Sequence, residues 1–143
     1  MYLTHSTVSN FLHDYQIIEA AELMAKLSLN DKFEPGDFKE SAIRDLLLKD
    51  AQYNNIDVVQ RFIDNQIITK RQSLGIFYLR YNLDTLAEYL AASCLYNEYH
   101  KDGRLAELIM KISRSASDVP GFKMVFEQVK NYKLNNEVGH EKI

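Results

Sequence analysis

The sequence predicts an all-α protein of about eight helices, arranged as four stacked antiparallel hairpins in a short α-solenoid. The strongest observation is an internal repeat: the pattern of 46–65 returns at 74–92, with Leu47 aligned to Leu74. Most of the remaining chain carries apolar residues at the spacing of amphipathic helices. No run of alternating β-branched residues indicates a sheet, so no strand is predicted.

Length and composition favour a single folded domain. The chain has 143 residues, 46% of them apolar, with two prolines and five glycines. A chain of this length buries about two-thirds of the surface that its unfolded form exposes. We therefore expect one helical-repeat domain over 1–134, followed by a flexible tail over 135–143, where apolar residues are scarce.

Charge and cysteine content narrow the class of protein. The net charge of −3 and the pI near 5.8 exclude a global basic field that would attract nucleic acid. Cys94 is the only cysteine, which excludes an intrachain disulfide and a four-cysteine metal site. No basic segment leads into an apolar core near the N-terminus, and no run approaches the roughly 18 apolar residues of a membrane span. We therefore expect a cytoplasmic protein without a signal peptide or membrane segment.

Two helices are predicted before the first break in the pattern. Thr4–His13 has the apolar spacing of a short helix, and a longer helix follows Asp14. One face of the longer helix carries Ile17, Ala20, Ala21, Met24 and Leu27. Pro35 and Gly36 then interrupt the helical pattern, because proline lacks a backbone donor and glycine permits unusual torsions.

The second helix pair is predicted on both sides of a tight turn at Asn54–Asn55. Its first helix covers Phe38–Gln52, and Asp37 with Glu40 forms a capping-box-like start. Its second helix covers Ile56–Ile67. The inward-facing residues of the pair are Ile43, Leu47, Leu48, Ala51, Ile56, Val59, Phe62 and Ile63.

The repeat predicts a third helix pair after the basic linker Thr69–Ser73. Its helices would begin at Leu74 and Leu83 and turn at Tyr81–Asn82, in the position of the earlier turn. Gly75 costs about 1 kcal/mol of helix stability relative to alanine, so we expect it to let another backbone approach closely.

A fourth pair completes the predicted solenoid. Its first helix covers Leu105–Ser115. Its second begins near Phe122, and Pro120 is placed in the first turn, where its missing amide costs nothing. The inward-facing residues of this last helix are Phe122, Val125, Phe126 and Val129.

The two middle pairs resemble ankyrin repeats over residues 46–92. The stretches AQYNNIDVVQRFIDN and YLRYNLDTLAEYLAA are similar to the part of that repeat in which a first helix ends at a tight polar turn and a leucine-rich second helix follows. The Thr-Pro-Leu-His start and the Gly-Ala-Asp finger of the family are absent. The resemblance implies a scaffold that binds a partner and carries no catalytic residues.

Residues that could carry chemistry are few and scattered. No two of the histidines His5, His13, His100 and His140 have the helical spacing of a zinc-protease motif. Cys94 lies among small residues and is interpreted as a small buried thiol rather than a nucleophile. Phosphate-binding loops and dinucleotide fingerprints are absent. We therefore expect no enzyme activity, no cofactor and no metal.

Tyrosines suggest a binding surface. The chain has nine of them, and tyrosine and arginine supply much of the binding energy at protein interfaces. The predicted partner-binding residues, at exposed helix corners, are Arg80, Tyr81, Tyr96 and Tyr99. Tyr78 and Tyr89 are expected to lie mostly in the core.

Three functions remain open on the sequence alone. We favour a non-catalytic protein–protein interaction module, such as an adaptor, inhibitor or effector, whose partner is another protein, with a homo-oligomer as a further option. The alternative is a small helical nucleic-acid-binding regulator, which would need its basic residues to gather on one face. Those residues are Lys70, Arg71, Arg80, Lys101 and Arg104. A helical enzyme is third, with little beyond Cys94 to support it.

Overall fold

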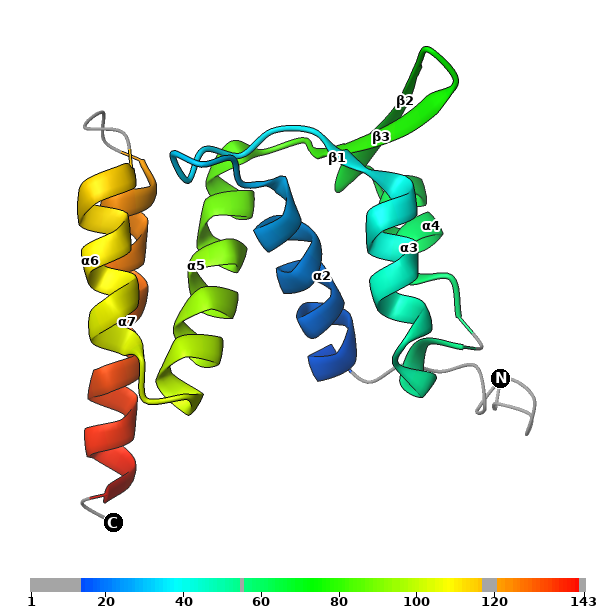
Figure 1. The fold of residues 1–143 in the computed structure, drawn as a ribbon. Coiled ribbons are helices and arrows are strands. Elements are labelled where there is room, and N and C mark those ends of the chain that lie inside the picture. Colours follow the sequence, from blue (N-terminus) through cyan, green and yellow to red (C-terminus); the bar gives the residue numbers. More distant parts are fainter. Residues whose placement is uncertain (1–13, 55, 117–120, 142–143) are drawn as a thin grey trace, which may run out of the picture.

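The computed structural model describes residues 14–54, 56–116 and 121–141 of the chain (Figure 1). Within these ranges the chain forms α-helices, one short 3-10 helix and three strands. In chain order the elements are α2 (Asp14–Ser28), β1 (Phe38–Lys39), α3 (Glu40–Leu48), η1 (Ala51–Tyr53), α4 (Val58–Asp64), β2 (Ile68–Ser73), β3 (Ile76–Tyr81), α5 (Asp84–Lys101), α6 (Leu105–Ser115) and α7 (Phe122–Glu141).

The all-α prediction is wrong, because β1, β2 and β3 form an antiparallel sheet with β3 in the middle. The described ranges hold six α-helices, where the sequence predicted about eight in four hairpins. Strand β3 occupies the segment where the internal repeat predicted the first helix of the third pair. The repeat therefore extends to secondary structure only in its second half, where α4 and α5 are both helices.

A two-residue turn at Leu74 and Gly75 joins β2 to β3. Both residues have a positive φ, 51° and 79°, as in a type I′ hairpin turn. A right-handed helix cannot pass through two such residues. Along β3 the burial alternates, with Leu79 and Tyr81 buried and Arg80 exposed, which is the period of a strand. Gly75 therefore serves the turn, and its predicted role in helix packing is wrong.

Helix α3 begins at Glu40, later than predicted, because the two residues before it pair with β3 as strand β1. The predicted cap, Asp37, forms an ion pair with Arg71 of β2 instead. Helix α4 does have a side-chain cap. The Asp57 carboxylate accepts a hydrogen bond from the Gln60 N–H at 3.0 Å.

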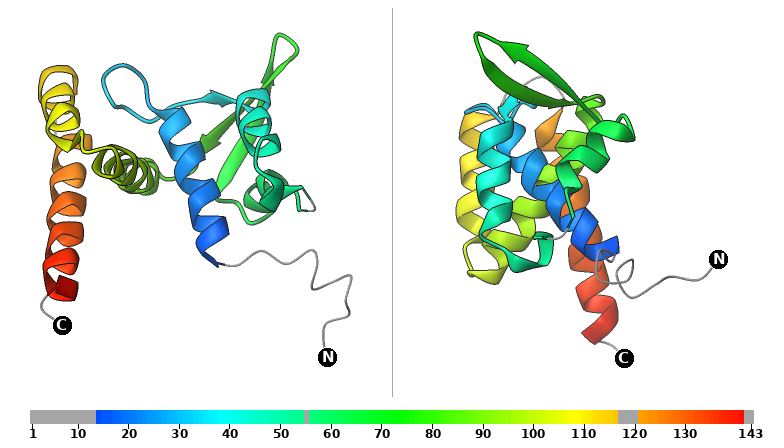
Figure 2. Two further views of the ribbon diagram at one scale, coloured as in Figure 1. Left: turned by 60° about the horizontal axis from the view of Figure 1, so that its bottom comes forward. Right: turned by 90° about the vertical axis from the view of Figure 1, so that its right-hand side faces the viewer.

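Helix α5 lies at the centre of the molecule. Helix α2 packs along one side of it and α6 and α7 along the other, while α3, α4 and the sheet lie beyond α2 (Figures 1 and 2). Both central helices bury small side chains, among them Ala20, Ala25, Ala87 and Ala91. Small side chains let two helix axes approach closely. The largest fully buried side chains are Met24, Ile43, Val58, Val59, Ile68, Leu79, Tyr96 and Leu108.

The structure describes the C-terminal end of the chain almost completely, whereas its described residues begin only at Asp14. The predicted helix Thr4–His13 lies outside the described residues. Helix α7 continues to Glu141, through most of the predicted tail at 135–143, whose flexibility stays a prediction. In the part of the chain that the structure describes, no helix combines the length and the apolar character needed to cross a bilayer.

Candidate functional site

The structure does not gather the four predicted binding residues on one surface. Arg80 lies on β3, with its guanidinium 3.4 Å from the Asp84 carboxylate. Tyr99 lies near the other end of α5, about 22 Å from Asp84 at a rise of about 1.5 Å per residue. Tyr81 and Tyr96 are only 2% and 1% exposed, so the prediction that they lie on exposed corners is wrong.

Tyr81 and Tyr96 are core residues. The Tyr81 hydroxyl donates to the Ala21 carbonyl at 2.5 Å, and burial raises the pKa of this phenol. The Tyr96 ring stacks on His100 with 5.2 Å between ring centres. Among the described residues the Tyr96 hydroxyl has no hydrogen-bond partner. Tyr89, predicted to lie mostly in the core, is exposed instead.

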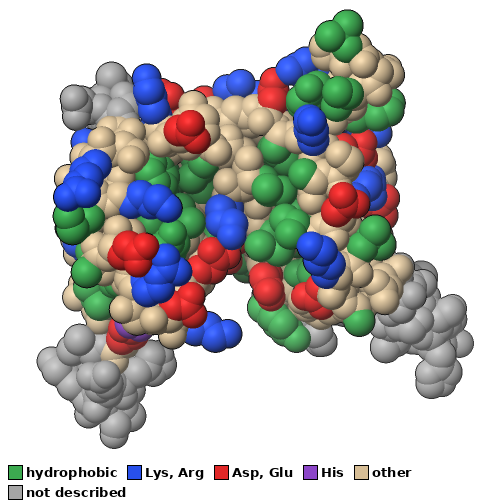
Figure 3. All heavy atoms as spheres, viewed as in Figure 1, with side chains coloured by type: hydrophobic (Ala, Val, Ile, Leu, Met, Phe, Trp, Pro, Cys, Tyr) green, Lys and Arg blue, Asp and Glu red, His purple; other side chains and the backbone are tan. Residues whose placement is uncertain are grey.

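The β2–β3 hairpin projects beyond the helices, and its end is apolar (Figures 1 and 3). Leu74, at the turn, is 99% exposed, and Ile76 and Phe77 are exposed as well. We call these three residues the apolar tip. Type I′ turns favour asparagine at the position of Leu74, because most other residues lose about 1–2 kcal/mol in the left-handed region.

Three cations line the stem of the hairpin, and each approaches a carboxylate. The pairs are Lys70 with Glu40 at 3.0 Å, Arg71 with Asp37, and Arg80 with Asp84. Two of them also cover aromatic rings. The Lys70 ammonium lies 4.3 Å from the centre of the Phe77 ring, and the Arg71 guanidinium carbon lies 4.9 Å from that of half-buried Tyr78. Such contacts contribute about 0.5–1 kcal/mol each at exposed sites. They therefore help to stabilise the end of a two-stranded hairpin that no helix covers.

Glu40 is a buried carboxylate that links α3 to the hairpin. It accepts a hydrogen bond from the Arg44 Nε at 2.9 Å and forms the ion pair with Lys70. Arg44 continues the chain of charges to Asp57 at 3.0 Å. Burial alone would raise the pKa of Glu40, but the hydrogen bonds from Lys70 and Arg44 outweigh it and lower that pKa.

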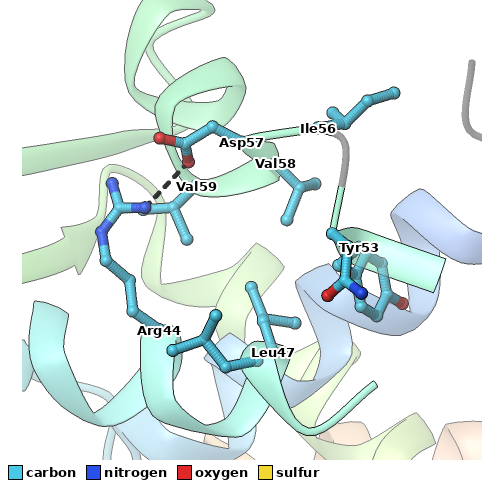
Figure 4. Close-up of a pocket in the computed structure, with 9 residues that line it drawn as sticks. Arg44, Leu47, Tyr53, Ile56, Asp57, Val58 and Val59 are labelled. Carbon is cyan, nitrogen blue, oxygen red and sulfur yellow. Dashed lines mark hydrogen bonds and ion pairs between the residues drawn. The ribbon is translucent and has the colours of Figure 1, made fainter. Parts of the chain in front are cut away.

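A pocket of about 330 Å³ opens between α3, η1 and α4 (Figure 4). Its lining residues are Arg44, Leu47, Leu48, Tyr53, Asn54, Ile56, Asp57, Val58 and Val59. The Arg44–Asp57 ion pair bridges α3 to the start of α4 at the rim, and burial raises the pKa of Tyr53 to about 12. No sequence signal pointed to this pocket.

A groove of about 430 Å³ lies between α2 and α5 and contains Cys94. The Cys94 sulfur lies 3.5 Å from Glu98, which also pairs with Lys26 at 2.8 Å. Burial raises the pKa of the Cys94 thiol to about 12, and the charge of Glu98 adds to this effect. Since the residue is buried, the interpretation of Cys94 as a small buried thiol is confirmed.

The Cys94 thiol is expected to react slowly with alkylating reagents at neutral pH. A rise in pKa from 9.0 to about 12 lowers the thiolate fraction, which is the reactive form, about a thousandfold. We expect iodoacetamide to label native Cys94 at least about 100-fold more slowly than the unfolded chain. A cysteine placed at exposed Leu48, in a chain whose Cys94 is alanine, is the matched control and should react at the ordinary rate. Equal rates at the two positions would contradict the environment described for Cys94.

The sequence did not lead us to Leu74 and Phe77 as site residues, and it pointed to Lys70 and Arg71 only as cations for nucleic acid. A signal for them was present. Leucine and glycine stand between two runs of six residues, and the second run, IFYLRY, is rich in aromatic and branched side chains. Aligning Leu74 with helical Leu47 concealed this hairpin pattern.

The described residues contain no group of three or more histidines, cysteines or acids placed to hold a metal ion. The sequence matches no protein-family model and no curated protein, and the fold matches no solved structure. The resemblance of residues 46–92 to ankyrin repeats is not tested by these comparisons and stays a prediction.

Proposed function

We propose that this chain is a non-catalytic protein–protein interaction module that docks onto a partner protein through its β2–β3 hairpin. An adaptor, an inhibitor and an effector all use such a module. The observation that carries the proposal is the apolar tip, and above all Leu74, whose side chain makes almost no contact with the rest of the chain.

Leu74 lowers the stability of the free chain in two ways. Its side chain is left in water, and its backbone lies in the left-handed region that leucine disfavours. Disfavoured backbone conformations of this kind cluster at functional sites, where a bound partner compensates the cost. Burying a leucine or phenylalanine side chain contributes about 1.5–3 kcal/mol. A partner that covers Leu74 and Phe77 would therefore gain more than the turn loses.

A nucleic-acid-binding regulator is less well supported. The five cations that it requires divide into two groups, because Lys101 and Arg104 lie at the far end of α5 from the hairpin. Each of the three hairpin cations approaches a carboxylate, which weakens the long-range field that attracts a phosphate backbone but leaves donors for a contact at short range. An enzyme that uses Cys94 is supported least, since a protonated thiol is a poor nucleophile.

Replacing Leu74 by asparagine is expected to strengthen the hairpin by about 0.5–1 kcal/mol while weakening partner binding. Asparagine tolerates the positive φ of this position, and Asn-Gly is a preferred type I′ pair. Native-state hydrogen exchange of the Ile76 amide, next to the turn, would measure the gain. Gly75→Ala is the control in the opposite direction. No atom lies within 4 Å of the added carbon, so the steric environment would not oppose it. The hairpin of this variant should lose about 1 kcal/mol of stability, and the positive φ alone would cause that loss. A Leu74→Asn hairpin that exchanges faster than the parent would contradict the turn geometry.

Site-specific photocrosslinking tests the proposed function. A photoreactive leucine analogue is placed at position 74, and in a second sample at position 48, in cells of the organism that encodes the chain. Leu48 is the matched control because its side chain is also exposed, at 74%, but lies on α3. We expect a discrete protein adduct from position 74 that is absent from position 48.

The outcomes of this experiment separate the functions. A protein adduct specific to position 74 supports docking through the hairpin. An adduct with nucleic acid would favour the regulator instead. Identical adducts from the two positions, or none from position 74, would overturn the proposal.

A further inference from the structure

We infer that the free edge of β2 binds an extended, acidic segment of another protein, which joins the sheet as a fourth strand. The inference rests on the proposed function and specifies the chemistry of the partner. Strand addition of this kind draws its affinity from main-chain hydrogen bonds and its specificity from the side chains on both faces.

The hairpin register shows which backbone groups of β2 are free to bond. Next to a two-residue turn, the flanking pair Ser73 and Ile76 exchanges hydrogen bonds, and every second pair along the ladder does the same. At the far end the Asn82 N–H donates to the Ile67 carbonyl at 3.0 Å, in phase with this alternation. The N–H and C=O groups of Lys70 and Gln72, which alternate with the bonded positions, therefore point away from β3.

The edge is open to a partner strand. In the part of the chain that the structure describes, β2 pairs with β3 alone, and β2 is an outer strand of the sheet. Four consecutive residues, 69–72, are exposed, so both faces of the strand are accessible. The turn end of the hairpin extends past the helices, which leaves room beside that part of β2 (Figure 2). By contrast, the other edge of β3 is occupied by β1 at Phe38 and Lys39.

The charge of the edge favours an acidic segment. Lys70 and Arg71 are neighbours, so their side chains lie on opposite faces of β2. Each approaches one carboxylate of this chain, but an ammonium has three donors and a guanidinium has five. Two adjacent acidic residues on an added strand would each lie beside one of these cations. Opposite charges on neighbouring strands stabilise the pairing, and like charges oppose it.

The same charges disfavour a second copy of this chain as the occupant. If two β2 edges paired antiparallel near their centres, Lys70 and Arg71 would lie opposite lysine and arginine of the other copy. Cations on an edge strand are a common device against self-pairing. An edge that rejects its own copy and presents free backbone groups fits an acidic partner strand.

Peptide binding to the full chain tests the inference. The first probe is an eight-residue peptide of valine and threonine with two adjacent glutamates at its centre. The second has two lysines in their place, and the third is the glutamate peptide N-methylated on alternate residues along one edge. We expect the glutamate peptide to bind about tenfold more tightly than the lysine peptide, and N-methylation of the pairing edge to abolish binding.

Amide hydrogen exchange reports where the peptide binds. The glutamate peptide should slow exchange at the amides of Lys70 and Gln72, which are free in the chain alone. The amides of Thr69 and Arg71, already bonded to β3, should change little. Protection at Thr69 and Arg71 but not at Lys70 and Gln72 would overturn the assignment of the edge.

Charge reversal supplies the matched variants. Arg71→Glu should remove the preference for the glutamate peptide, whereas Arg104→Glu should preserve it. The two arginines are comparable controls, because their side chains are 52% and 50% exposed and each forms one ion pair. Lys70 is left in place because it pairs with buried Glu40.

The remaining outcomes decide between occupants. Equal affinity for the glutamate and lysine peptides, or no binding at millimolar concentration, would overturn strand addition. Protection of the Lys70 and Gln72 amides in the chain alone, together with a dimer in sedimentation, would assign the edge to a second copy. If the peptide tests fail while position 74 still yields a protein adduct, the proposed function stands and only the inference of an acidic partner strand is overturned. Loss of that adduct would overturn the proposed function itself.

Discussion

Replacing Leu79 by alanine is expected to lower the free energy of unfolding by about 2–5 kcal/mol, the usual cost of a cavity in a well-packed core. Leu79 is fully buried on the central strand of the sheet, where it pairs with Phe38 on one side and Lys70 on the other. Strands flank β3 on both sides, so the backbone has little freedom to close the cavity. Urea denaturation followed by circular dichroism would measure the loss.

The control for this prediction is Leu48→Ala, because Leu48 is exposed on the last turn of α3. This variant should change the stability by less than about 0.5 kcal/mol. If Leu79→Ala were as stable as Leu48→Ala, the inner face of β3 would not be part of the core. That result would favour the helix that the repeat predicts for this segment over the strand.

Replacing Glu40 by glutamine is expected to cost on the order of 2 kcal/mol at pH 7, because two charge-assisted hydrogen bonds to a buried carboxylate are weakened. The bonds come from Lys70 and Arg44, which would be left without a full negative charge between them. The loss should loosen the contact between α3 and the hairpin. Urea denaturation of the parent and the variant at several pH values would measure it.

The difference between parent and Glu40→Gln should disappear in acid. The hydrogen bonds hold the pKa of Glu40 below its usual value of 4.5 in the folded chain, so the unfolded chain takes up the proton first as the pH falls. The stabilisation is therefore fully present above about pH 4.5 and is lost as the pH falls through the lower folded pKa. Glu107→Gln is the control, since Glu107 forms an exposed pair with Arg104, and it should alter stability little at any pH. A difference that stays constant down to pH 2 would argue against the ion pairs of Glu40.

The helices with long amphipathic patterns were predictable from the sequence. The predicted helix Leu105–Ser115 matches α6, and the last helix has the predicted residues Phe122, Phe126 and Val129 buried. The apolar face of α2 was predicted correctly as well, as the burial of Met24 shows. The face predicted for α3 was correct only in part, because Ile43 is buried but Leu48 is exposed. Over three or more turns, a period of 3.6 residues cannot be mistaken for another pattern.

The hairpin was not predictable by the same reasoning. The six residues of β3 are too few to distinguish the period of a strand from that of a helix, so the alignment of Leu74 with helical Leu47 decided the prediction wrongly. The place of β3 in the middle of the sheet also depends on β1, which lies about forty positions earlier in the chain and pairs with Leu79 and Tyr78. A local pattern of apolar residues cannot show that two segments so far apart in the chain will pair.

The sequence by itself therefore determined where the long helices lie and which of their faces are buried, because both properties follow from local spacing. Only the tertiary structure decided which tyrosines are buried. Tyr81 is buried because α2 supplies the Ala21 carbonyl to its hydroxyl, and Tyr96 because the helices around α5 close over it. It also decided the candidate site, since the exposure of Leu74 and the free edge at Lys70 exist only once β2 pairs with β3. The burial of these two tyrosines and the free edge of the sheet arise from contacts between segments that are distant in the chain, and local spacing does not encode such contacts.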